Sequence, residues 1–460
     1  PNIAAKDDPM LKAILAAKTQ WVTLFGKSWD LHVTAGLHTT LPENLAMIDD
    51  SITYLRSQGR RVIYDAEHWF DGYKNNAAYA LNTLKTAANA GAEWLVLCDT
   101  NGGTLPYEIA EIIAGIHQAL PDLKIPLGIH THNDAGMAVA NAIAAVQGGA
   151  NMVQGTINGY GERCGNANLC TLVPTLQLKL KETCLEPEKL VKLTEMSRLV
   201  SEIVNLAPDD HAPYVGRSAF AHKGGIHVSA VQKNPLTYEH IAPEAIGNER
   251  RIVISDQSGL SNILSKAASF GITLDKKDPQ CRKILEQLKN LEHEGYQFEA
   301  AEASFQLLIR SALGHRQEFF SLQGFHVHSE VGEPTVQHPA SAIATIKLEV
   351  NGKKLLEAAE GNGPVAALDQ ALRKALTKFY PEIANFSLTD YKVRILEGAA
   401  GTGAKTRVLV ESSDGKQRWT TVGVSENILE ASYRALVESI EYGLLMHSPY
   451  PSVPLPVSTV

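Results

Sequence analysis

The stretch IPLGIHTHND, residues 125–134, begins as an apolar run and ends in two histidines, an amide and a carboxylate. The apolar part has the length and composition that are typical of a buried β-strand. Alternate residues of a strand point to the same face, so the side chains of His130 and His132 are expected to project together. We therefore interpret this stretch as a buried strand whose carboxyl end carries a functional site.

Four further apolar runs precede or follow this one, and stretches of helical period separate them. The five runs are WVTLFG (21–26), RVIYD (61–65), EWLVLC (93–98), IPLGIH (125–130) and MVQGTI (152–157). Their starts lie 27 to 40 residues apart, which is the spacing of βα units in a parallel sheet covered by helices. Such a chain is α/β, and five units form either an open doubly wound sheet or the last five units of an eight-unit TIM barrel.

The first residues favour the barrel. Residues 9–19 have a helical pattern and lead directly into the first strand, so the chain starts in the middle of a repeating unit. We expect residues 1–185 to form a partial TIM-barrel catalytic domain that contains the C-terminal five βα units of a (β/α)8 barrel. The first three βα units are expected to be absent, which would leave sheet edges that a closed barrel lacks.

The pattern changes after residue 185. Residues 186–315 are mostly helical by period and are expected to form helical linker subdomains. Alternating strands dominate residues 316–447, and a Pro-rich tail at 448–460 is expected to be flexible.

The region 316–447 contains one pattern written twice. Residues 342–376 and 405–436 each read as strand, hairpin turn, strand, glycine-containing loop and helix. Asn351-Gly352 and Asp414-Gly415 are the expected hairpin turns. A duplicated ββα unit predicts a small α+β domain with pseudo-twofold symmetry.

The composition is that of a globular protein with a sizeable core, since 44% of the 460 residues are hydrophobic and 20% are charged. The formal net charge is −8 and no basic block occurs, so nucleic acid and anionic membranes are not expected partners. No apolar run reaches the ~18 residues of a membrane-spanning helix. The five cysteines are odd in number and lie within periodic segments, which indicates reduced thiols and a cytoplasmic location.

Polar residues crowd the ends of four consecutive predicted strands, while the bodies of these strands are apolar. In a parallel α/β architecture the active site lies at the carboxyl ends of the strands, so these residues are candidates for chemistry. They are Asp65 to His68, Asp99 to Thr104, His130 to Asp134, and Asn158 to Asn166.

His130 and His132 are suited to bind one divalent metal ion, because two imidazole nitrogens on one strand face can converge. The alternative is a pair of structural histidines, one hydrogen-bonded in the core and one capping the loop. Two neutral imidazoles do not balance a dication, so an anion is needed. It could come from an absent strand, from a substrate carboxylate, or from Glu67, Asp99, Asp134 or Glu162. Asn166 offers either an amide oxygen to the metal or an N-cap to the helix that follows it.

A second segment, AHKGGIHVSAVQKNPLTYEH at 221–240, holds His222, His227, Tyr238 and His240 in what reads as a glycine-containing loop. Such a segment could deliver an acid–base group to an active site. A plain surface loop explains the same pattern.

Four motifs together resemble one enzyme family. GIHTHNDAG (128–136), CDTNGGTLP (98–106), YDAEHWFDGYK (64–74) and NGYGERCGNANL (158–169) resemble the metal-dependent Claisen-condensing synthases of the DRE-TIM metallolyase group. These are the 2-isopropylmalate, homocitrate and citramalate synthases. FGKSWDLHV (25–33) is most similar to the (R)-citramalate synthases within the group, and the resemblance covers essentially the whole chain.

The resemblance implies a role for each matching residue. His130 and His132 match the metal-binding pair of the family, and Asn166 matches an amide near the metal, which is Mn²⁺, Mg²⁺ or Zn²⁺. Thr100 matches a threonine that contacts the carboxylate of the keto acid, and its neighbours Asp99 and Asn101 are also expected to bind substrate.

The catalytic residues that the resemblance implies come from two parts of the chain. Glu67 matches an acidic residue of the substrate pocket. His227 and Tyr238 match residues of a helical subdomain that reaches the active site of a neighbouring subunit, where the histidine is the proposed general base. The duplicated C-terminal unit resembles the family's regulatory domain, which implies a homodimer and feedback inhibition by isoleucine or leucine.

The chain departs from the family at its start. The family's first strand carries an Arg-Asp pair whose aspartate binds the metal, and no such pair precedes residue 20. A chain with this sequence alone is therefore expected to bind metal poorly and to be inactive without the N-terminal strands.

The resemblance implies an acyltransferase that condenses acetyl-CoA with pyruvate to (R)-citramalate and CoA, in isoleucine biosynthesis. Three alternatives remain. The first is a 2-isopropylmalate synthase that uses 2-oxoisovalerate in leucine biosynthesis, since one or two methylenes change binding by only ~1–3 kcal/mol. The others are a lyase or aldolase on the same barrel, and an inactive truncated scaffold.

Overall fold

The computed structural model describes residues 3–254, 258–275, 278–330, 341–396 and 398–447. The chain divides into two compact units. The N-terminal unit comprises residues 1–220 and 241–250, and the C-terminal unit comprises residues 221–240 and 251–460.

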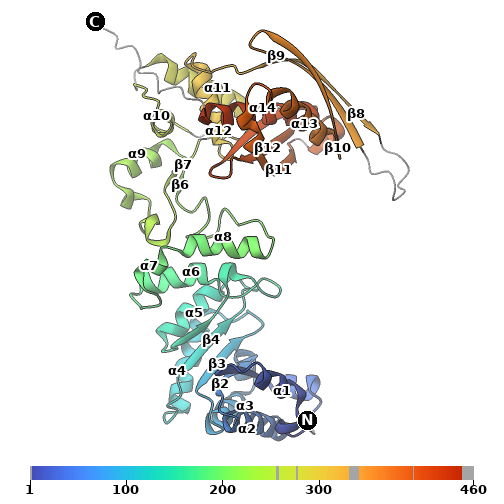
Figure 1. The fold of residues 1–460 in the computed structure, drawn as a ribbon. Coiled ribbons are helices and arrows are strands. Elements are labelled where there is room, and N and C mark those ends of the chain that lie inside the picture. Colours follow the sequence, from blue (N-terminus) through green and yellow to red (C-terminus); the bar gives the residue numbers. More distant parts are fainter. Residues whose placement is uncertain (1–2, 255–257, 276–277, 331–340, 397, 448–460) are drawn as a thin grey trace. The chain divides into compact units, whose positions relative to one another are not determined.

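The N-terminal unit is built on a five-stranded parallel sheet (Figure 1). Its strands are β1 (Trp21–Lys27), β2 (Arg61–Glu67), β3 (Trp94–Asp99), β4 (Leu127–Thr131) and β5 (Met152–Gln154). The spatial order β1-β2-β3-β4-β5 follows the sequence without reversal. A doubly wound sheet reverses its order at a switch point, so this order is that of a barrel wall. The prediction of five βα units with barrel topology is confirmed.

Helices connect successive strands. They are α2 (Leu41–Ser57), α3 (Trp69–Asn89), α4 (Pro106–Ala119) and α5 (Ala138–Gln147), with α1 (Pro9–Ala16) before the first strand. Asp8 caps α1 and Thr40 caps α2 with a side-chain oxygen, and a proline follows each cap, as is favourable at a helix start. The apolar faces of these helices and the outward residues of the strands form one core.

The two faces of the sheet differ. In β2, Val62, Tyr64 and Ala66 are fully buried under the helices, whereas Asp65 and Glu67 alternate with them on the other face. By register, Glu67 shares this second face with His130 on β4, whereas Asp99 on β3 has the opposite parity and contacts Asn141 of α5.

The sheet is strongly curved toward this polar side. The amide nitrogen of Gln154 on β5 donates to a carboxylate oxygen of Asp65 on β2 at 2.9 Å. Three strand intervals separate β2 and β5, which is about 14 Å in a flat sheet at ~4.8 Å per interval. A direct side-chain contact over that span requires curvature of the kind found in a barrel wall.

Three further helices complete the N-terminal unit after β5. They are α6 (Leu169–Pro174), α7 (Pro187–Leu190) and α8 (Leu193–Ile203). Ser197 and Ser201 on α8 turn inward and bond the side chains of Asn158 and Tyr160, which ties the loop after β5 to this helix.

The C-terminal unit begins with helices and two short strands. Its first elements are β6 (Ala221–His222), α9 (Gly225–Lys233), β7 (Arg251–Ile252), α10 (Leu260–Ser269), α11 (Pro279–His293) and α12 (Glu302–Ala312). The segment 221–240 was expected to be a loop, and this was wrong: Gly225–Lys233 is helical, with Val228 and Val231 buried on one face. Two adjacent glycines usually indicate a loop, but here Gly224 is the N-cap and Gly225 is the first residue of the helix.

The remainder of the C-terminal unit is a duplicated α+β fold (Figure 1). One antiparallel sheet has the order β10-β9-β8 and the other has the order β11-β12-β13. The strands are β8 (Ser321–Glu330), β9 (Ser341–Val350), β10 (Lys353–Gly361), β11 (Ser387–Ile395), β12 (Thr406–Ser413) and β13 (Arg418–Ser425). Helices α13 (Pro364–Leu376) and α14 (Ile428–His447) pack on the sheets and share one core with them.

Each repeat is thus a three-stranded meander followed by a helix, one strand more than the sequence pattern indicated. Asn351 and Gly352 both have positive φ in the first predicted hairpin, as a two-residue turn requires, and Asp414-Gly415 turns the second. The predicted tail 448–460 lies outside the described residues. All five cysteines are free thiols. Within the described ranges, none of the helices has the length and apolarity to cross a membrane.

Candidate active site

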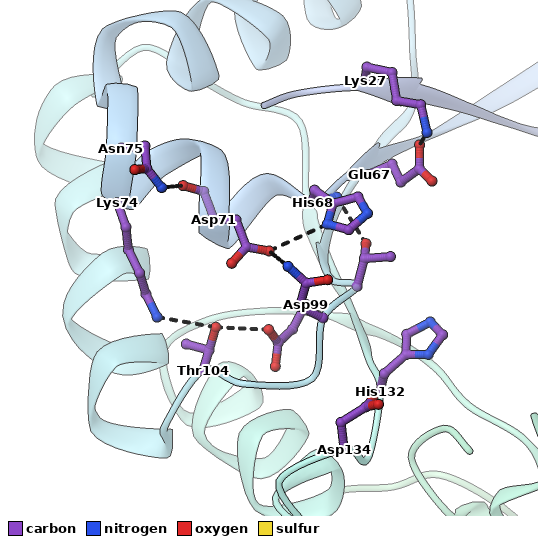
Figure 2. Close-up of polar contacts among 12 residues, drawn as sticks. Lys27, Glu67, His68, Asp71, Lys74, Asn75, Asp99, Thr104, His132 and Asp134 are labelled. Atoms are coloured by element: carbon purple, nitrogen blue, oxygen red, sulfur yellow. Dashed lines mark hydrogen bonds and ion pairs between the residues drawn. The ribbon is translucent and has the colours of Figure 1, made fainter. Parts of the chain in front are cut away.

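The parallel sheet brings the predicted strand-end residues to one edge. Glu67, Asp99 and Thr131 are the last residues of β2, β3 and β4, and their strands run side by side in register. Figure 2 shows side chains from these ends and the adjoining loops, with Glu67 turned to Lys27 and Asp99 turned to Thr104. The juxtaposition expected from sequence is therefore present within the N-terminal unit.

His130 and His132 converge as their spacing predicted. The two Nε2 atoms are 3.2 Å apart, and the ring centroids are 5.1 Å apart. His132 is 9% exposed and His130 is half-buried. Burial lowers the pKa of His132, and the neighbouring His130 and Arg163 lower it further, so the ring is held in its neutral form.

Asn166 reaches this pair because its segment runs antiparallel to the end of β4. Residues His132 and Asn166 form an isolated β-bridge, and the N–H of Ala167 donates to the carbonyl of Thr131 at 3.1 Å. The amide nitrogen Nδ2 of Asn166 then lies 3.2 Å from Nε2 of His130. Asn166 does not cap the following helix: Asn168 does so, since its side chain accepts from the N–H of Cys170 at 2.9 Å.

The turn that carries Asn166 needs glycine. Gly165 has φ +88°, and a Cβ there would lie 2.0 Å from the carbonyl oxygen of Gly159. No L side chain fits at this distance in this conformation. Glycine at position 165 is thus required for the turn that brings Asn166 beside the histidines.

Of the residues around the two histidines, Asp65 and Arg163 lie in the predicted strand-end segments, whereas Gln154 was missed at the level of sequence. Oε1 of Gln154 on β5 lies 2.9 Å from Nδ1 of His130, and Nε2 of the same amide donates to Asp65. Nη2 of Arg163 lies 3.1 Å from Nδ1 of His132 and donates to the carbonyl of Thr100 at 2.6 Å. The available signal was an amide inside an apolar run, MVQGTI, one strand over from His130.

Arg163 is anchored by a second pair. Its Nε donates to a carboxylate oxygen of Asp134 at 2.7 Å, and its Nη2 donates to the other oxygen at 3.0 Å. This bidentate contact lowers the pKa of Asp134. Glu162, the other predicted acidic neighbour, is a weaker partner of Arg163 at 3.6 Å.

The donor set fits a divalent metal ion. Two imidazole nitrogens bound to one ion at about 2.0–2.1 Å lie about 2.9–3.4 Å apart in octahedral or tetrahedral geometry, and the observed separation is 3.2 Å. No group of three or more His, Cys, Asp or Glu able to hold a metal occurs among the described residues. Of the predicted ligands, the Asn166 amide is the further group beside the two histidines, and an amide oxygen suits a hard, oxygen-preferring ion.

The loop after β3 places the three predicted substrate residues differently. The carboxylate of Asp99 is 1% exposed and accepts from the hydroxyl of Thr104 at 2.8 Å (Figure 2). It also accepts from the amide of Asn141 at 3.3 Å. Burial raises its pKa. Asn101 is exposed and donates to Asp71 at 3.0 Å. The buried carboxylate of Asp99 therefore stabilises the conformation of the loop after β3.

Thr100 is the residue of this loop that is best placed for a ligand. Its hydroxyl oxygen accepts from the N–H of His68 at 2.9 Å, which leaves its proton available to a carboxylate. His68 has φ +56°, an uncommon value for a residue other than glycine, so the turn after β2 is held in shape by this contact.

Glu67 lies at the neighbouring strand end and is paired with the ammonium of Lys27 on β1 (Figure 2). The rings of Trp29, His32 and His68 stack beside it, with centroids of His32 and His68 4.1 Å apart. The Glu67 carboxylate thus has one cationic partner, and a cluster of aromatic rings lies close to it.

In the C-terminal unit, His227 and Tyr238 lie together. Their ring centroids are 4.2 Å apart, and both side chains are exposed. Behind them the buried His222 pairs with Glu239, with Nε2 3.0 Å from Oε1. A cavity of about 950 Å³ adjoins His227, and its lining includes Gly225, Lys233 and Ser261. The predicted acid–base pair is thus held next to a cavity large enough for part of a substrate.

Comparison with known proteins shows the family to which the chain belongs. An (R)-citramalate synthase of Synechocystis sp. is 70% identical over 451 residues, which cover 96% of this chain and 82% of that protein. The chain belongs to the (R)-citramalate synthase family. Family members from Geobacter sulfurreducens and Aquifex aeolicus are 55% and 52% identical, over 96% and 97% of this chain and 83% and 84% of those proteins.

Three domain families match successive parts of this citramalate synthase family member. Residues 3–200 match the HMGL-like family, residues 214–296 match the homocitrate synthase post-HMGL domain, and residues 299–444 match the LeuA allosteric (dimerisation) domain. The family comprises acyltransferases that depend on a divalent metal ion, and its C-terminal domain serves dimerisation and allosteric control. The resemblance stated from four short motifs is therefore confirmed over nearly the whole chain.

Proposed function

We propose that this chain condenses acetyl-CoA with pyruvate to give (R)-citramalate and CoA, at a divalent metal ion held by His130, His132 and Asn166. One observation carries the proposal: the Nε2 atoms of the two histidines lie 3.2 Å apart at the carboxyl end of a parallel strand. Relatives named (R)-citramalate synthase at 46% to 70% identity support pyruvate as the 2-oxo acid. The metal is Mn²⁺, Mg²⁺ or Zn²⁺.

The residues around the metal site would bind and orient the keto acid. A divalent ion bound there would polarise the keto group. The Thr100 hydroxyl is the donor for the substrate carboxylate, since its oxygen already accepts from His68. Asn101 adds an exposed amide on the same loop. Asp99 supports both from below through Thr104 and Asn141.

Proton transfer is assigned to His227, and Tyr238 and Glu67 support it. His227 is the general base that takes a proton from the acetyl methyl group, and Tyr238 stacks against it and fixes its ring. Glu67 belongs to the substrate pocket, and its ion pair with Lys27 orients the carboxylate. The resulting enolate attacks the keto carbon of pyruvate, and water then cleaves the thioester and releases CoA.

The C-terminal repeats are assigned to assembly and control. The match to the LeuA allosteric (dimerisation) domain over residues 299–444 supports a homodimer. We propose isoleucine or leucine as the feedback inhibitor, because an end product of the pathway is the expected effector of a committed step.

The test is thiol release from acetyl-CoA by the full gene product with Mn²⁺ and either pyruvate or 2-oxoisovalerate. Release with pyruvate supports citramalate synthesis. Release with 2-oxoisovalerate alone would overturn the choice of pyruvate and make the enzyme a 2-isopropylmalate synthase. Absence of release with both acids would overturn the proposed reaction.

A further inference from the structure

A chain of two hydrogen bonds runs from β2 to the first metal-site histidine. Nδ1 of His130 lies 2.9 Å from Oε1 of Gln154, and Nε2 of Gln154 lies 2.9 Å from Oδ1 of Asp65. His130 and Gln154 are direct register partners on β4 and β5. All three side chains are half-buried on the concave, polar side of the sheet.

The chemistry of the groups fixes the direction of both bonds. A carboxylate only accepts hydrogen bonds, so Asp65 requires the NH₂ end of the Gln154 amide. Gln154 then presents its oxygen to His130, and that oxygen requires a proton on Nδ1. A neutral imidazole protonated on Nδ1 has its lone pair on Nε2. The lone pair of His130 therefore points toward the centre of the proposed metal site.

His132 has the opposite proton arrangement. Nη2 of Arg163 lies 3.1 Å from its Nδ1 and shares two hydrogens among this nitrogen, the Thr100 carbonyl and Asp134. A guanidinium cannot accept a hydrogen bond, so the nitrogen that faces it is the one without a proton. The proton of neutral His132 is then on Nε2 and points at Nε2 of His130, 3.2 Å away. The Asn166 amide also turns its Nδ2 to that same lone pair, at 3.2 Å. Two donors thus occupy the position of a cation.

We propose that Gln154 and Asp65 are positioning residues that hold His130 permanently in the metal-binding tautomer, while His132 and Asn166 must rearrange before they can bind the ion. The inference deepens the proposed function and rests on its metal assignment. On metal entry His132 has to move its proton from Nε2 to Nδ1 and Arg163 has to withdraw. Asn166 has to turn its amide so that oxygen replaces nitrogen. His130 needs no change.

The consequence is a specific role for a residue that never touches the metal. Removal of an outer partner of a ligating histidine typically weakens metal binding 10–100-fold. Gln154→Leu should therefore weaken Mn²⁺ binding by about 10–100-fold, because His130 loses the acceptor that fixes its proton on Nδ1. In the double variant Asp65→Asn with Gln154→Glu, the amide at 65 donates to the carboxylate at 154, which still accepts from Nδ1–H of His130. Both hydrogen bonds are kept, so the variant should recover most of that loss.

The experiment uses the full gene product with ¹⁵N-labelled histidine. In metal-free protein, two-bond ¹H–¹⁵N spectra should show His130 protonated on Nδ1 and His132 on Nε2, each assigned by the signal lost in its own His→Gln variant. Gln154→Leu should remove the Nδ1–H signature of His130. Titration with Mn²⁺, followed by electron paramagnetic resonance, then gives the dissociation constants of the same samples.

Gln177→Leu is the matched control. Gln177 is another half-buried glutamine of the N-terminal unit with both amide ends bonded, to Leu185 N–H and carbonyl. Its loss should leave the His130 tautomer and the Mn²⁺ affinity unchanged, which separates positioning from general stability.

The outcomes distinguish this inference from the function on which it rests. His130 protonated on Nε2 in the wild type, or Mn²⁺ affinity within twofold of wild type in Gln154→Leu, would overturn the positioning role. Unchanged Mn²⁺ binding in His130→Ala would instead overturn the metal assignment, and with it the need for positioning, whatever the tautomer.

Discussion

The two units of the chain treat buried polar side chains in different ways. In the N-terminal unit they gather at the ends of parallel strands, as His130, His132 and Asp99 do, where each has a partner from another strand or loop. In the C-terminal unit a comparable cluster lies between two helices: Ser304 of α12 donates to Glu438 of α14, and Arg316 pairs with Glu441.

The difference teaches where function can be read from geometry. Strand ends leave lone pairs and protons directed into a shared space, which a ligand can enter. The helix-packed cluster closes on itself, because each charge faces a partner from the neighbouring segment.

The largest effect is expected at the strand ends. Replacing both His130 and His132 by alanine removes two metal ligands, so turnover should fall on the order of 10³-fold or more, since a metal supplies several kcal/mol of transition-state stabilisation. The measurement is CoA release by the full gene product, with circular dichroism as a check on folding. His117→Ala, at an exposed histidine of α4, should keep turnover within twofold. Wild-type turnover in the double variant would contradict the metal site.

The His227 segment tests whether the C-terminal unit contributes chemistry as well as control. Loss of a general base costs about 10²–10⁴-fold, so His227→Ala should lower kcat by that amount while Mn²⁺ affinity is unchanged. Parallel measurement of kcat and of Mn²⁺ binding separates the roles of the two units. The matched control is His293→Ala, at an exposed histidine of α11. Equal loss of metal affinity and kcat would argue that the effect is structural.

The fold of the N-terminal unit could be predicted because strand and helix periods alternate in a simple way, and the strand-end rule then placed His130 beside Glu67 and Asp99. What could not be predicted depends on side-chain direction. The carboxylate of Asp99 turns inward to Thr104 and Asn141, although its position in sequence is equivalent to that of a pocket residue. Gln154 and Asp65 meet only because the sheet curves, and curvature is not encoded in a local pattern.

In the C-terminal unit the two hairpins were visible because Asn-Gly and Asp-Gly turns are local signals. Strands β8 and β11 were missed as members of the repeat, since each joins its meander through a longer connection. Helix α9 was read as a loop because Gly224 and Gly225 stand at its start. The role of His227 came from resemblance, as nothing in its periodicity sets it apart from a surface histidine.

A third prediction concerns the turn that carries Asn166. Gly165→Ala places a Cβ 2.0 Å from the Gly159 carbonyl at φ +88°, so the loop must shift and Asn166 moves away from His130. Strain of this kind costs about 1–3 kcal/mol, and Mn²⁺ affinity and kcat should both fall about tenfold or more. Gly136→Ala is the control: its φ is +71°, but no atom lies within 4 Å of the added Cβ. Equal effects of both variants on Mn²⁺ affinity would show that φ alone matters.

The smallest effect is expected in the helix-packed cluster, where it appears as pH-dependent stability. Burial raises the pKa of Glu438 to about 7 from the usual 4.5, and the hydrogen bond from Ser304 and the charge of Arg316 lower it only in part. Between pH 4.5 and 7 the Glu438 carboxyl is mostly protonated in the folded protein and mostly ionised in the unfolded chain. Stability from this group is therefore present at low pH and is lost as pH rises toward 7, by up to about 3 kcal/mol.

Glu438→Gln keeps an oxygen for Ser304 and removes the charge. The variant should match the wild type in thermal midpoint near pH 5 and exceed it by several degrees at pH 8, as followed by differential scanning calorimetry of the full gene product. Glu430→Gln provides the opposite sign on the same helix, because Ser425 and Arg434 lower the pKa of half-buried Glu430, so its midpoint at pH 8 should not rise. A Glu438→Gln midpoint below wild type at pH 8 would mean that the ionised carboxylate is stabilised by Arg316 after all. In that case the cluster of the C-terminal unit would be an ordinary ion-pair network, and the contrast with the strand ends would lie in access to ligand and not in the state of the charges.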